Sequence, residues 1–509
     1  MMRRALLAIS LLILLPFVVQ VYSIEDSYVE CERVVNKWAE SSAENVKTED
    51  KLSLKDLLFF LHIPRTGGRA YYQCFLRKLY SLDKECPRSY DKIRFDLSKP
   101  NCNIVVSHDD YSLMSKLPKD ITSVVTILRD PVERVFSMYE FAVEVAARFL
   151  VHPNLTSALT SKVKPKSSRM VSTLDIWPWK YLVPWMREDL FTRREARRLG
   201  KLKRSALSDV YNTEDVVMPL HEFISHPIAH EIIHNGAAFQ VAGLTNSSYL
   251  DDAHEVRRCV RKHPSLGQFV LEVAKGRLDQ MLFVGFTEDH KKSARMFASM
   301  VGLQVLSRSK SAPSDFQPQS TNQKNVGSSA QVVTDKAAEG TNQANSIGDK
   351  VFTATDTSSP KGNMTAEQLM RKYEQLMRKY EDCIENSHKV QKSRHAMSLK
   401  RISPVNFTKE ARHLVPDSML EEMKILNSLD MELYRHAQSI FLQQQILMED
   451  HDKQTKILAE NVPVEIDAPR NFLLLLVTLV PLVLFFIVVM FKRSCCIKYF
   501  YVAKMKKAG

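Results

Sequence analysis

The segment Leu57-Leu-Phe-Phe-Leu-His-Ile-Pro-Arg-Thr-Gly-Gly-Arg69 is an apolar run that leads into a turn with two glycines and two arginines. The apolar run has the length and character of a buried strand. Gly67 and Gly68 would let backbone N–H groups approach the oxygens of an anion, and the start of a following helix favours negative charge. Arg65 and Arg69 add fixed positive charge. The segment therefore predicts a strand, an anion-binding turn and a helix, although a plain turn with surface arginines is the alternative.

This turn is not a Walker A loop, because the spacing G-x-x-x-x-G-K-[ST] is absent. Apolar runs and helical segments alternate around it. The β-like runs are Leu57 to Leu61, Ile104 to Val106 and Ser123 to Leu128, and the helical segments lie at about 69 to 82, 131 to 149, 228 to 240, 268 to 282 and 289 to 301. The alternation predicts an α/β fold with a central, mostly parallel sheet flanked by helices.

A second strand-to-helix junction lies at Ser123-Val-Val-Thr-Ile-Leu-Arg-Asp-Pro-Val-Glu-Arg-Val-Phe-Ser137. Pro131 suits the first position of the helix. Arg129 and Ser137 would together hold a phosphate, the guanidinium through charge-assisted hydrogen bonds and the serine through its hydroxyl. The alternative is an ordinary helix start with Asp130 as its cap.

The composition limits the class of partner. The chain has 509 residues, of which 45% are hydrophobic and 25% charged, which excludes wholesale disorder and a collagen-like fibre. The 71 lysines and arginines exceed the 58 aspartates and glutamates by 71 − 58 = 13 charges. This excess indicates an anionic partner, such as a phosphate or sulfate ester, an acidic peptide, a polyanionic glycan or nucleic acid. The two ends of the chain argue against nucleic acid.

The amino-terminal end has the pattern of a secretory signal peptide. Arg3 and Arg4 precede an apolar run from Ala5 to Val21, and the small residue Ser23 lies before acidic residues. We therefore predict a signal peptide over residues 1–23, with an uncleaved membrane anchor as the alternative.

The carboxy-terminal end predicts a transmembrane helix at residues 472–491, which are 20 residues without a charge. The tail, residues 492–509, carries lysine and arginine but no acidic residue, so it is expected in the cytosol. The sequence thus predicts a single-pass type I membrane protein with a lumenal domain. Lys506 and Lys507 resemble a dilysine retrieval signal, which implies coat-complex recognition and cycling between the Golgi and the endoplasmic reticulum. A simple basic patch is the alternative.

Cysteine usage agrees with a lumenal domain. The cysteines on that side are Cys31, Cys74, Cys86, Cys102, Cys259 and Cys383. Six cysteines permit three disulfides in 15 pairings, among which the sequence does not choose. They contain no C-x2-C pair, so no zinc site is expected. Glycosylation sequons begin at Asn154, Asn246, Asn363 and Asn406.

The lumenal region has an interruption. Residues 309–362 are rich in Ser, Thr, Gln, Asn, Ala and Lys and predict a disordered insertion, because they cannot bury enough apolar surface. The first part of the domain would be residues 24–308 and its helical remainder residues 363–456, which includes a tandem heptad at 367–380. Residues 457–471 would be a linker to the membrane.

Several motifs carry a family resemblance. Residues 62–69 resemble the 5′-phosphosulfate loop of Golgi sulfotransferases, and residues 128–137 resemble their 3′-phosphate motif. Residues 107–111, Ser-His-Asp-Asp-Tyr, are similar to the base-bearing segment of the heparan sulfate 6-O-sulfotransferases. With the tryptophan-rich run at 177–185, the whole chain looks most like the plant tyrosylprotein sulfotransferases. The resemblance covers most of residues 31–450 apart from the insertion. Leu282 to Glu288 and Leu429 to Tyr434 resemble later segments of the same sulfotransferase domain.

The resemblance implies a P-loop-like sulfotransferase domain in the Golgi membrane. The donor would be 3′-phosphoadenosine 5′-phosphosulfate (PAPS), with no metal, and the acceptor a tyrosine hydroxyl beside acidic residues in secreted peptide precursors, including those of plant peptide hormones. The donor-binding residues would be Arg65, Thr66, Gly67, Gly68, Arg69, Arg129 and Ser137.

The resemblance also implies two catalytic residues. His108 would be the general base, because a histidine with a pKa near 6.5 can accept the proton of a phenol with a pKa of about 10. Asp109 or Asp110 would orient it. Arg65 would stabilise the departing 5′-phosphate. Many sulfotransferases have lysine at this position, so here a planar guanidinium replaces the compact charge of an ammonium group.

The sequence also fits two other functions. The local motifs also fit a glycan O-sulfotransferase that acts on a heparan sulfate-like chain, and a non-catalytic type I receptor or adaptor belongs to a different class. Trp177, Trp179 and Trp185 would form either an acceptor wall or a packed core. The basic run at 193–204 would either steer acidic substrates or form a solvated face.

Overall fold

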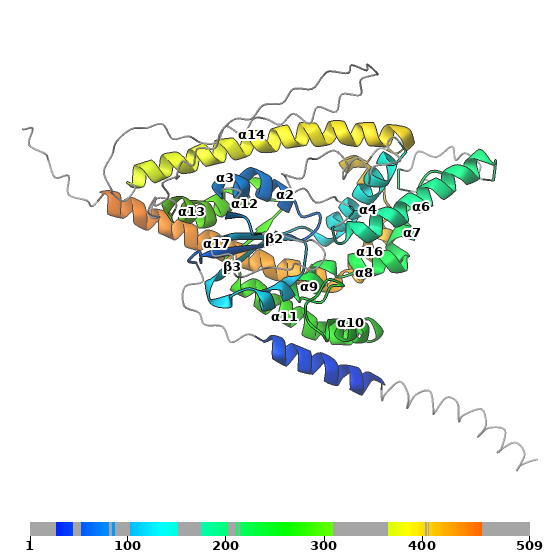
Figure 1. Ribbon diagram of the computed structural model, residues 1–509, viewed down its shortest axis with the longest axis horizontal. Helices are drawn as coiled ribbons and strands as arrows, with labels where there is room; N and C mark the ends of the chain where they lie inside the picture. Colours follow the sequence, from blue (N-terminus) through cyan, green and yellow to red (C-terminus); the bar gives the residue numbers. More distant parts are fainter. Residues whose placement is uncertain are drawn as a thin grey trace, which may run out of the picture. The chain divides into compact units, whose positions relative to one another are not determined.

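The computed structural model of the protein describes residues 27–43, 52–80, 84–86, 102–150, 174, 176–201, 210–211, 214–308, 365–402, 405 and 407–460 (Figure 1). The expected signal peptide, insertion, transmembrane segment and cytosolic tail lie outside these residues. Within the described ranges, no helix is long and apolar enough to cross a membrane. The chain divides into two units, residues 1–445 and 446–509, and the site described below belongs to the first.

The sheet consists of β1 (Leu57–Leu61), β2 (Ile104–Ser107), β3 (Thr122–Leu128) and β4 (Phe283–Phe286) in the order β2-β1-β3-β4. All the pairings are parallel. Every strand residue is buried, which explains the unbroken apolar runs in the sequence. The prediction of a mostly parallel sheet is confirmed, with three of the strands named in advance and β4 missed.

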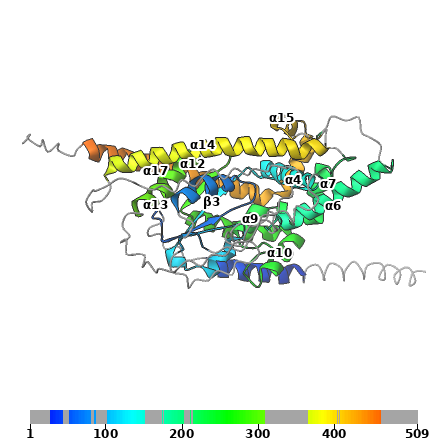
Figure 2. The same cartoon turned by 45° about the horizontal axis from the view of Figure 1, so that its top comes forward.

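Helices follow and cover these strands. After β1 come α2 (Gly68–Ala70), the π-helix η1 (Tyr71–Leu76) and α3 (Arg77–Leu79), and after β2 the 3₁₀ helices η3 (Tyr111–Lys116) and η4 (Lys119–Ile121). After β3 come α4 (Pro131–Arg148), α6 (Trp179–Arg198), α7 (Leu220–Ser225), α8 (Pro227–Ile233), α9 (Gly236–Val241), α10 (Ala253–Lys262), η6 (Pro264–Leu266) and α11 (Gly267–Gln280). After β4 come α12 (His290–Phe297), η7 (Ala298–Gly302), α13 (Leu303–Arg308), α14 (Ala366–Leu399), η8 (Lys400–Ile402), α15 (Lys409–Arg412), α16 (Asp417–Leu426) and α17 (Ser428–Glu460). Figures 1 and 2 show α12 and α14 on one side of the sheet and α9 and α10 on the other.

Two predicted helices are each broken into two. The expected helix at 228–240 divides into α8 and α9, because Asn235 adopts a left-handed conformation with φ of 53°. Asparagine tolerates this conformation better than other residues with a side chain. The stretch from about 417 to 456 likewise divides at Asn427 into α16 and α17. The two asparagines contact each other's segments: Oδ1 of Asn427 accepts from the backbone N–H of Asn235 at 3.1 Å, and Oδ1 of Asn235 accepts from the backbone N–H of Leu429 at 2.9 Å.

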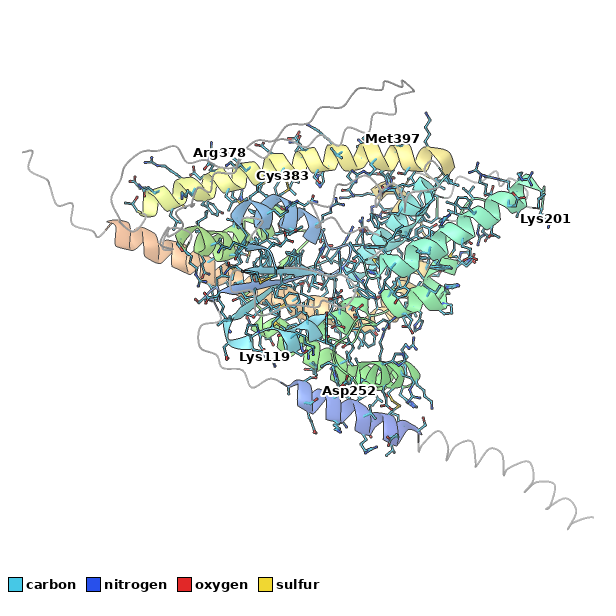
Figure 3. All side chains as sticks on the ribbon, in the orientation of Figure 1. Lys119, Lys201, Asp252, Arg378, Cys383 and Met397 are labelled. Carbon is cyan, nitrogen blue, oxygen red and sulfur yellow. A yellow bond between two sulfur atoms is a disulfide. The ribbon has the colours of Figure 1, made fainter. Side chains whose placement is uncertain are left out.

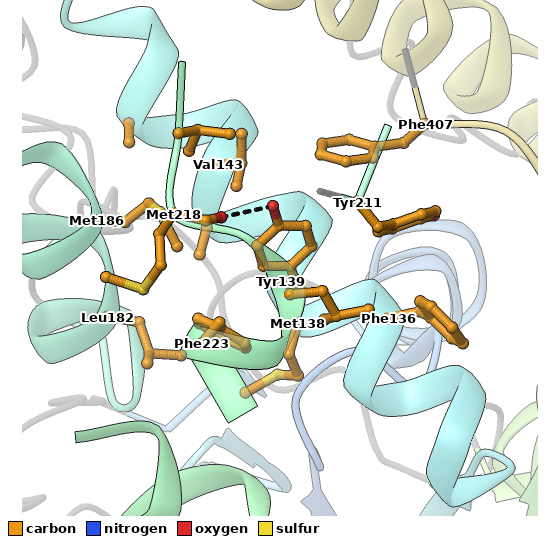
Figure 4. Packing of buried hydrophobic residues seen from close by; sticks show 14 of the residues in the cluster. Phe136, Met138, Tyr139, Val143, Leu182, Met186, Tyr211, Met218, Phe223 and Phe407 are labelled. Atoms are coloured by element: carbon orange, nitrogen blue, oxygen red, sulfur yellow. Dashed lines mark hydrogen bonds between the residues drawn. The ribbon is translucent and has the colours of Figure 1, made fainter. Parts of the chain in front are cut away.

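One hydrophobic cluster lies between α4, α6, α7 and α8 (Figure 4). Tyr139 is fully buried in it, and its hydroxyl donates to the carbonyl of Met218 at 2.7 Å. Trp179 packs edge-on against Phe141, with 4.5 Å between the ring centroids. Trp177 and Trp179 are both buried, so packing, rather than an exposed acceptor wall, accounts for them.

The disulfides are Cys31–Cys259, Cys74–Cys383 and Cys86–Cys102. The second joins η1 to α14, and Figure 3 labels Cys383 on that helix. Next to it, Tyr380 stacks on Phe75 with 3.9 Å between centroids, and both are buried. Tyr380, the last residue of the tandem heptad, therefore packs against the rest of its own domain.

Candidate active site at the carboxyl edge of the sheet

Each strand of the sheet is followed at once by a polar residue. His62 follows β1, His108 follows β2, Arg129 follows β3 and Thr287 follows β4. Because the strands are parallel, these residues gather at one edge of the sheet. Ligands of open α/β sheets bind at this edge, next to the place where the strand order reverses. Here the reversal lies at β1, which pairs with β2 on one side and β3 on the other.

The turn after β1 is a tight loop. The Thr66 hydroxyl donates to the carbonyl of Ile63 at 2.9 Å, and Thr66 is buried. Gly67 has φ of 76°, a left-handed value that suits glycine, and helix α2 begins at Gly68. Arg69 is exposed in the first turn of that helix. The predicted strand, turn and helix are thus confirmed as a local structure.

The Arg65 side chain lies along α4. Its Nε donates to Oγ of Ser137 at 2.8 Å, and its guanidinium lies 4.5 Å from the centre of the Phe141 ring. Burial lowers the pKa of this guanidinium to about 10, and the neighbouring charge of Arg129 acts in the same direction. Arg65 therefore stays a cation at neutral pH, in a place where an anion would relieve the repulsion.

Arg129 completes the cluster of cations. Its guanidinium donates to the carbonyl of Arg65 at 3.4 Å and to Glu133 at 3.0 Å. Its Nε is buried and has no hydrogen-bond partner among the described residues. The structure thus brings together Arg65, Arg129 and Ser137, which the sequence assigned to two separate motifs.

Residues after β4 tie the two loops together. The Thr287 hydroxyl donates to the carbonyl of Thr66 at 2.7 Å and lies 3.1 Å from that of Leu128. Glu288 accepts from the backbone N–H of Asp130 at 2.9 Å and from the Tyr434 hydroxyl at 3.0 Å. Thr287 and Glu288 lie in a segment whose family resemblance was noted in the sequence, but neither residue was predicted to have a role in the site.

His108 lies beside a second histidine. The rings of His62 and His108 are stacked, with centroids 4.1 Å apart and an interplanar angle of 28°. Asp109 is fully buried and accepts from the Tyr249 hydroxyl at 3.3 Å. The fully buried Gln240 of α9 donates to the carbonyl of His108 at 2.9 Å. His62 lies in the predicted phosphosulfate loop but was given no role there, and Gln240 was not predicted at all.

The two aspartates after His108 differ in their contacts. Asp110 accepts from the backbone N–H and the hydroxyl of Thr245, both at 2.7 Å. It also accepts from the backbone N–H of Ser112 at 3.0 Å and from the Ser112 hydroxyl. These contacts make Asp110 a loop-holding residue. That Asp109 or Asp110 orients His108 stays a prediction.

Two arginines of the basic run after the tryptophans form ion pairs. Arg193 bonds Asp189 at 2.9 Å and Glu222 at 2.6 Å, and Arg198 bonds Glu195 at 2.7 Å. Asp189, Arg193, Glu195 and Arg198 lie on α6, which ends close to Lys201 in Figure 3, whereas Glu222 lies on α7. Among the described residues, no group of three or more His, Cys, Asp or Glu side chains could hold a metal ion.

His234 makes folding sensitive to pH. It lies just before α9 and is buried, and its Nε2 donates to the carbonyl of Ile224 at 2.9 Å. Burial and the neighbouring His230 lower its pKa from 6.5 to about 4. At this histidine the unfolded chain therefore binds a proton below pH 6.5, whereas the native state binds it only below about pH 4. The free energy of unfolding therefore decreases as the pH falls through this window.

We expect this loss to reach up to about 3 kcal/mol at pH 4. His234→Gln keeps a donor for Ile224 but does not titrate, so urea denaturation of this variant at several pH values should show a flatter decline. His254→Gln, at an exposed position on α10, is the matched control and should leave the slope unchanged. An identical slope for His234→Gln and the unaltered protein would contradict the assignment.

Comparison with known proteins adds to this geometry. No protein-family profile matches the chain. A protein-tyrosine sulfotransferase of Arabidopsis thaliana is 51% identical to it over 427 residues, which are 83% of this chain and 83% of that protein. Because this identity extends over most of both proteins, the chain belongs to the protein-tyrosine sulfotransferase family.

Proposed function

We propose that this protein transfers the sulfuryl group of PAPS to tyrosine hydroxyls of secreted peptide precursors, at tyrosines beside acidic residues. The observation that carries the proposal is the 51% identity to a protein-tyrosine sulfotransferase over most of both chains. The cluster of cations at the carboxyl edge of the sheet supports it, because PAPS brings two anionic groups to its protein.

The residues of this edge fit such a donor. Arg65 and Arg129 are cations held close together, and Arg129 retains a buried Nε without a partner in the described part of the chain. Gly67, exposed with its left-handed backbone, leaves the loop open to close approach. In the proposal Arg65, Thr66, Gly67, Gly68 and Arg69 hold the 5′-phosphosulfate. Arg129 and Ser137 hold the 3′-phosphate.

His108 is proposed as the general base. A tyrosine phenol with a pKa of about 10 is protonated in the secretory pathway, so its proton must leave as the oxygen attacks sulfur. A histidine at the end of β2, supported through its backbone by Gln240, is suited to take that proton. Arg65 would stabilise the negative charge that develops on the departing 5′-phosphate, as in other group transfers of this kind.

We also propose a cellular setting. The expected signal peptide, transmembrane segment and basic tail support a type I protein of the Golgi membrane with the enzyme domain in the lumen. The disulfides are consistent with an oxidising compartment. Asn246, at one of the sequons, is an exposed residue, and its amide oxygen accepts a hydrogen bond from Arg257. Lys506 and Lys507 would be the residues that a coat complex recognises.

A transfer assay tests the function. The full chain, purified in detergent, would be incubated with radiolabelled PAPS and two acceptors side by side, an Asp-Tyr peptide and desulfated heparan sulfate. We expect label on the peptide's tyrosine alone. Label on the glycan alone would replace the proposal with a glycan O-sulfotransferase, and donor binding without any transfer would favour a non-catalytic receptor or adaptor.

Replacing Arg129 should lower the affinity for the donor more than it lowers the rate of transfer. Arg129→Ala removes charge-assisted hydrogen bonds, so we expect the affinity for 3′-phosphoadenosine 5′-phosphate to fall by about 10- to 100-fold. The rate at saturating donor should change little. Titration calorimetry measures the affinity, and Arg187→Ala on the exposed side of α6 is the control. Unchanged affinity in Arg129→Ala would contradict its role.

A further inference from the structure

His62 belongs to the active site through its contacts as well as its position. The backbone N–H of His62 donates to the carbonyl of Ser107 at 2.9 Å, which continues the pairing of β1 with β2 past the end of the strands. Its ring lies nearly parallel to the ring of Phe60, with 5.5 Å between centroids, and stacks on His108 at 4.1 Å. His62 is therefore held from the sheet and touches the proposed base directly.

The same ring lies against the donor loop. A Cβ added to Gly68 would meet Cδ2 of His62 at 2.4 Å and its Nε2 at 2.7 Å. Real Cβ atoms do not approach other atoms so closely, so only glycine leaves room for the imidazole. Gly68 is the first residue of α2, directly after the turn that carries Arg65. One flat ring thus bridges the proposed donor loop and the proposed base.

The backbone beneath the two rings is fixed from α9. The Nε2 of Gln240 lies 2.9 Å from the carbonyl of His108, 3.3 Å from that of Asp109 and 3.4 Å from that of His62. The amide group therefore clamps the ends of β1 and β2 together. With the backbone held, the ring of His62, which stacks on the face of His108, limits the directions that the His108 ring can take.

We propose that His62 is a positioning residue for His108, and that it couples the seating of the donor loop to the direction of the base. The proposal rests on the proposed function, since it assumes that His108 takes the phenolic proton. A base displaced by about 1 Å can lose about 100-fold in rate, so a ring that holds it matters for turnover without contributing to donor affinity. A flat aromatic ring of similar size should preserve the stack.

The test compares His62→Ala, His62→Phe and His108→Ala in the full chain. For each we would measure kcat with the Asp-Tyr peptide at saturating PAPS, the affinity for 3′-phosphoadenosine 5′-phosphate, and the Tm. We expect His62→Ala to lower kcat by about 10- to 100-fold and to leave the affinity within about threefold. His62→Phe should recover most of the rate lost in His62→Ala. His254→Ala on α10 is the control for replacing a histidine.

Three results would overturn the proposal. They are an unchanged kcat in His62→Ala, a loss of kcat in step with donor affinity, and a His62→Phe variant no faster than His62→Ala. If His62→Ala does not fold, His62→Leu fills the same space without a flat ring and should lower kcat while the donor affinity stays within about threefold. Full activity in His108→Ala would instead overturn the assigned base, so the two failures are distinguishable.

Discussion

His108→Ala is expected to lower kcat by about 100- to 10,000-fold, the range that a positioned general base contributes. Without the imidazole, the phenolic proton has no acceptor of suitable pKa at the end of β2. Donor binding should stay nearly intact, because the cations assigned to the donor belong to other loops, Arg65 after β1 and Arg129 after β3.

The measurement pairs single-turnover rates with calorimetric titration of 3′-phosphoadenosine 5′-phosphate. Rates should be taken with excess enzyme, so that release of product does not mask the chemical step. His254→Ala serves as the control at an exposed histidine. If His108→Ala and Arg129→Ala lost the same donor affinity, the division of roles between base and donor site would be wrong.

Asp430→Ala is expected to lower the free energy of unfolding by about 3–5 kcal/mol, as breaking a buried ion pair does. The side chains of Arg134 and Asp430 are 2% and 1% exposed and lie 2.9 Å apart. Asp430 also accepts from the backbone N–H groups of Ala237 and Ala238, at 3.1 and 2.7 Å, at the start of α9. The substitution would leave a buried guanidinium and two buried donors without a carboxylate.

Urea denaturation of the full chain, followed by circular dichroism, would measure this loss. Glu422→Ala, which removes an exposed carboxylate from the neighbouring helix α16, is the matched control and should change stability by less than about 0.5 kcal/mol. A loss below about 1 kcal/mol for Asp430→Ala would mean that the pair is not a main support of the contact between α4, α9 and α17.

The strands show where sequence reasoning succeeds. β1 was predicted with the bounds that the structure has, because five consecutive apolar residues precede a turn signal. β4 was missed because it has only four residues and contains Gly285. A Cβ at Gly285 would meet the Phe283 ring at 2.7 Å and Ile127 at 2.9 Å, so tertiary packing requires a residue that strand propensity disfavours.

The candidate site likewise contains some residues that could be predicted from the sequence and others that could not. Arg65, Arg129 and Ser137 lie in motifs next to strands, and parallel strands bring their carboxyl ends to one edge, so their meeting was predictable. Gln240 contacts His108 across 132 positions and Thr287 contacts Thr66 across 221. No local pattern marks such residues. They are recognised only when the fold shows which backbone carbonyls need a donor.

The disulfide between Cys74 and Cys383 joins two segments that lie far apart in the sequence. One cysteine precedes residues 309–364 and the other follows them, so the bond closes a covalent ring through both parts of the domain. A protease that cut the chain once within that stretch would leave a molecule that migrates as one species on a non-reducing gel and as two after reduction. The two segments could therefore be severed and still remain one covalently joined molecule.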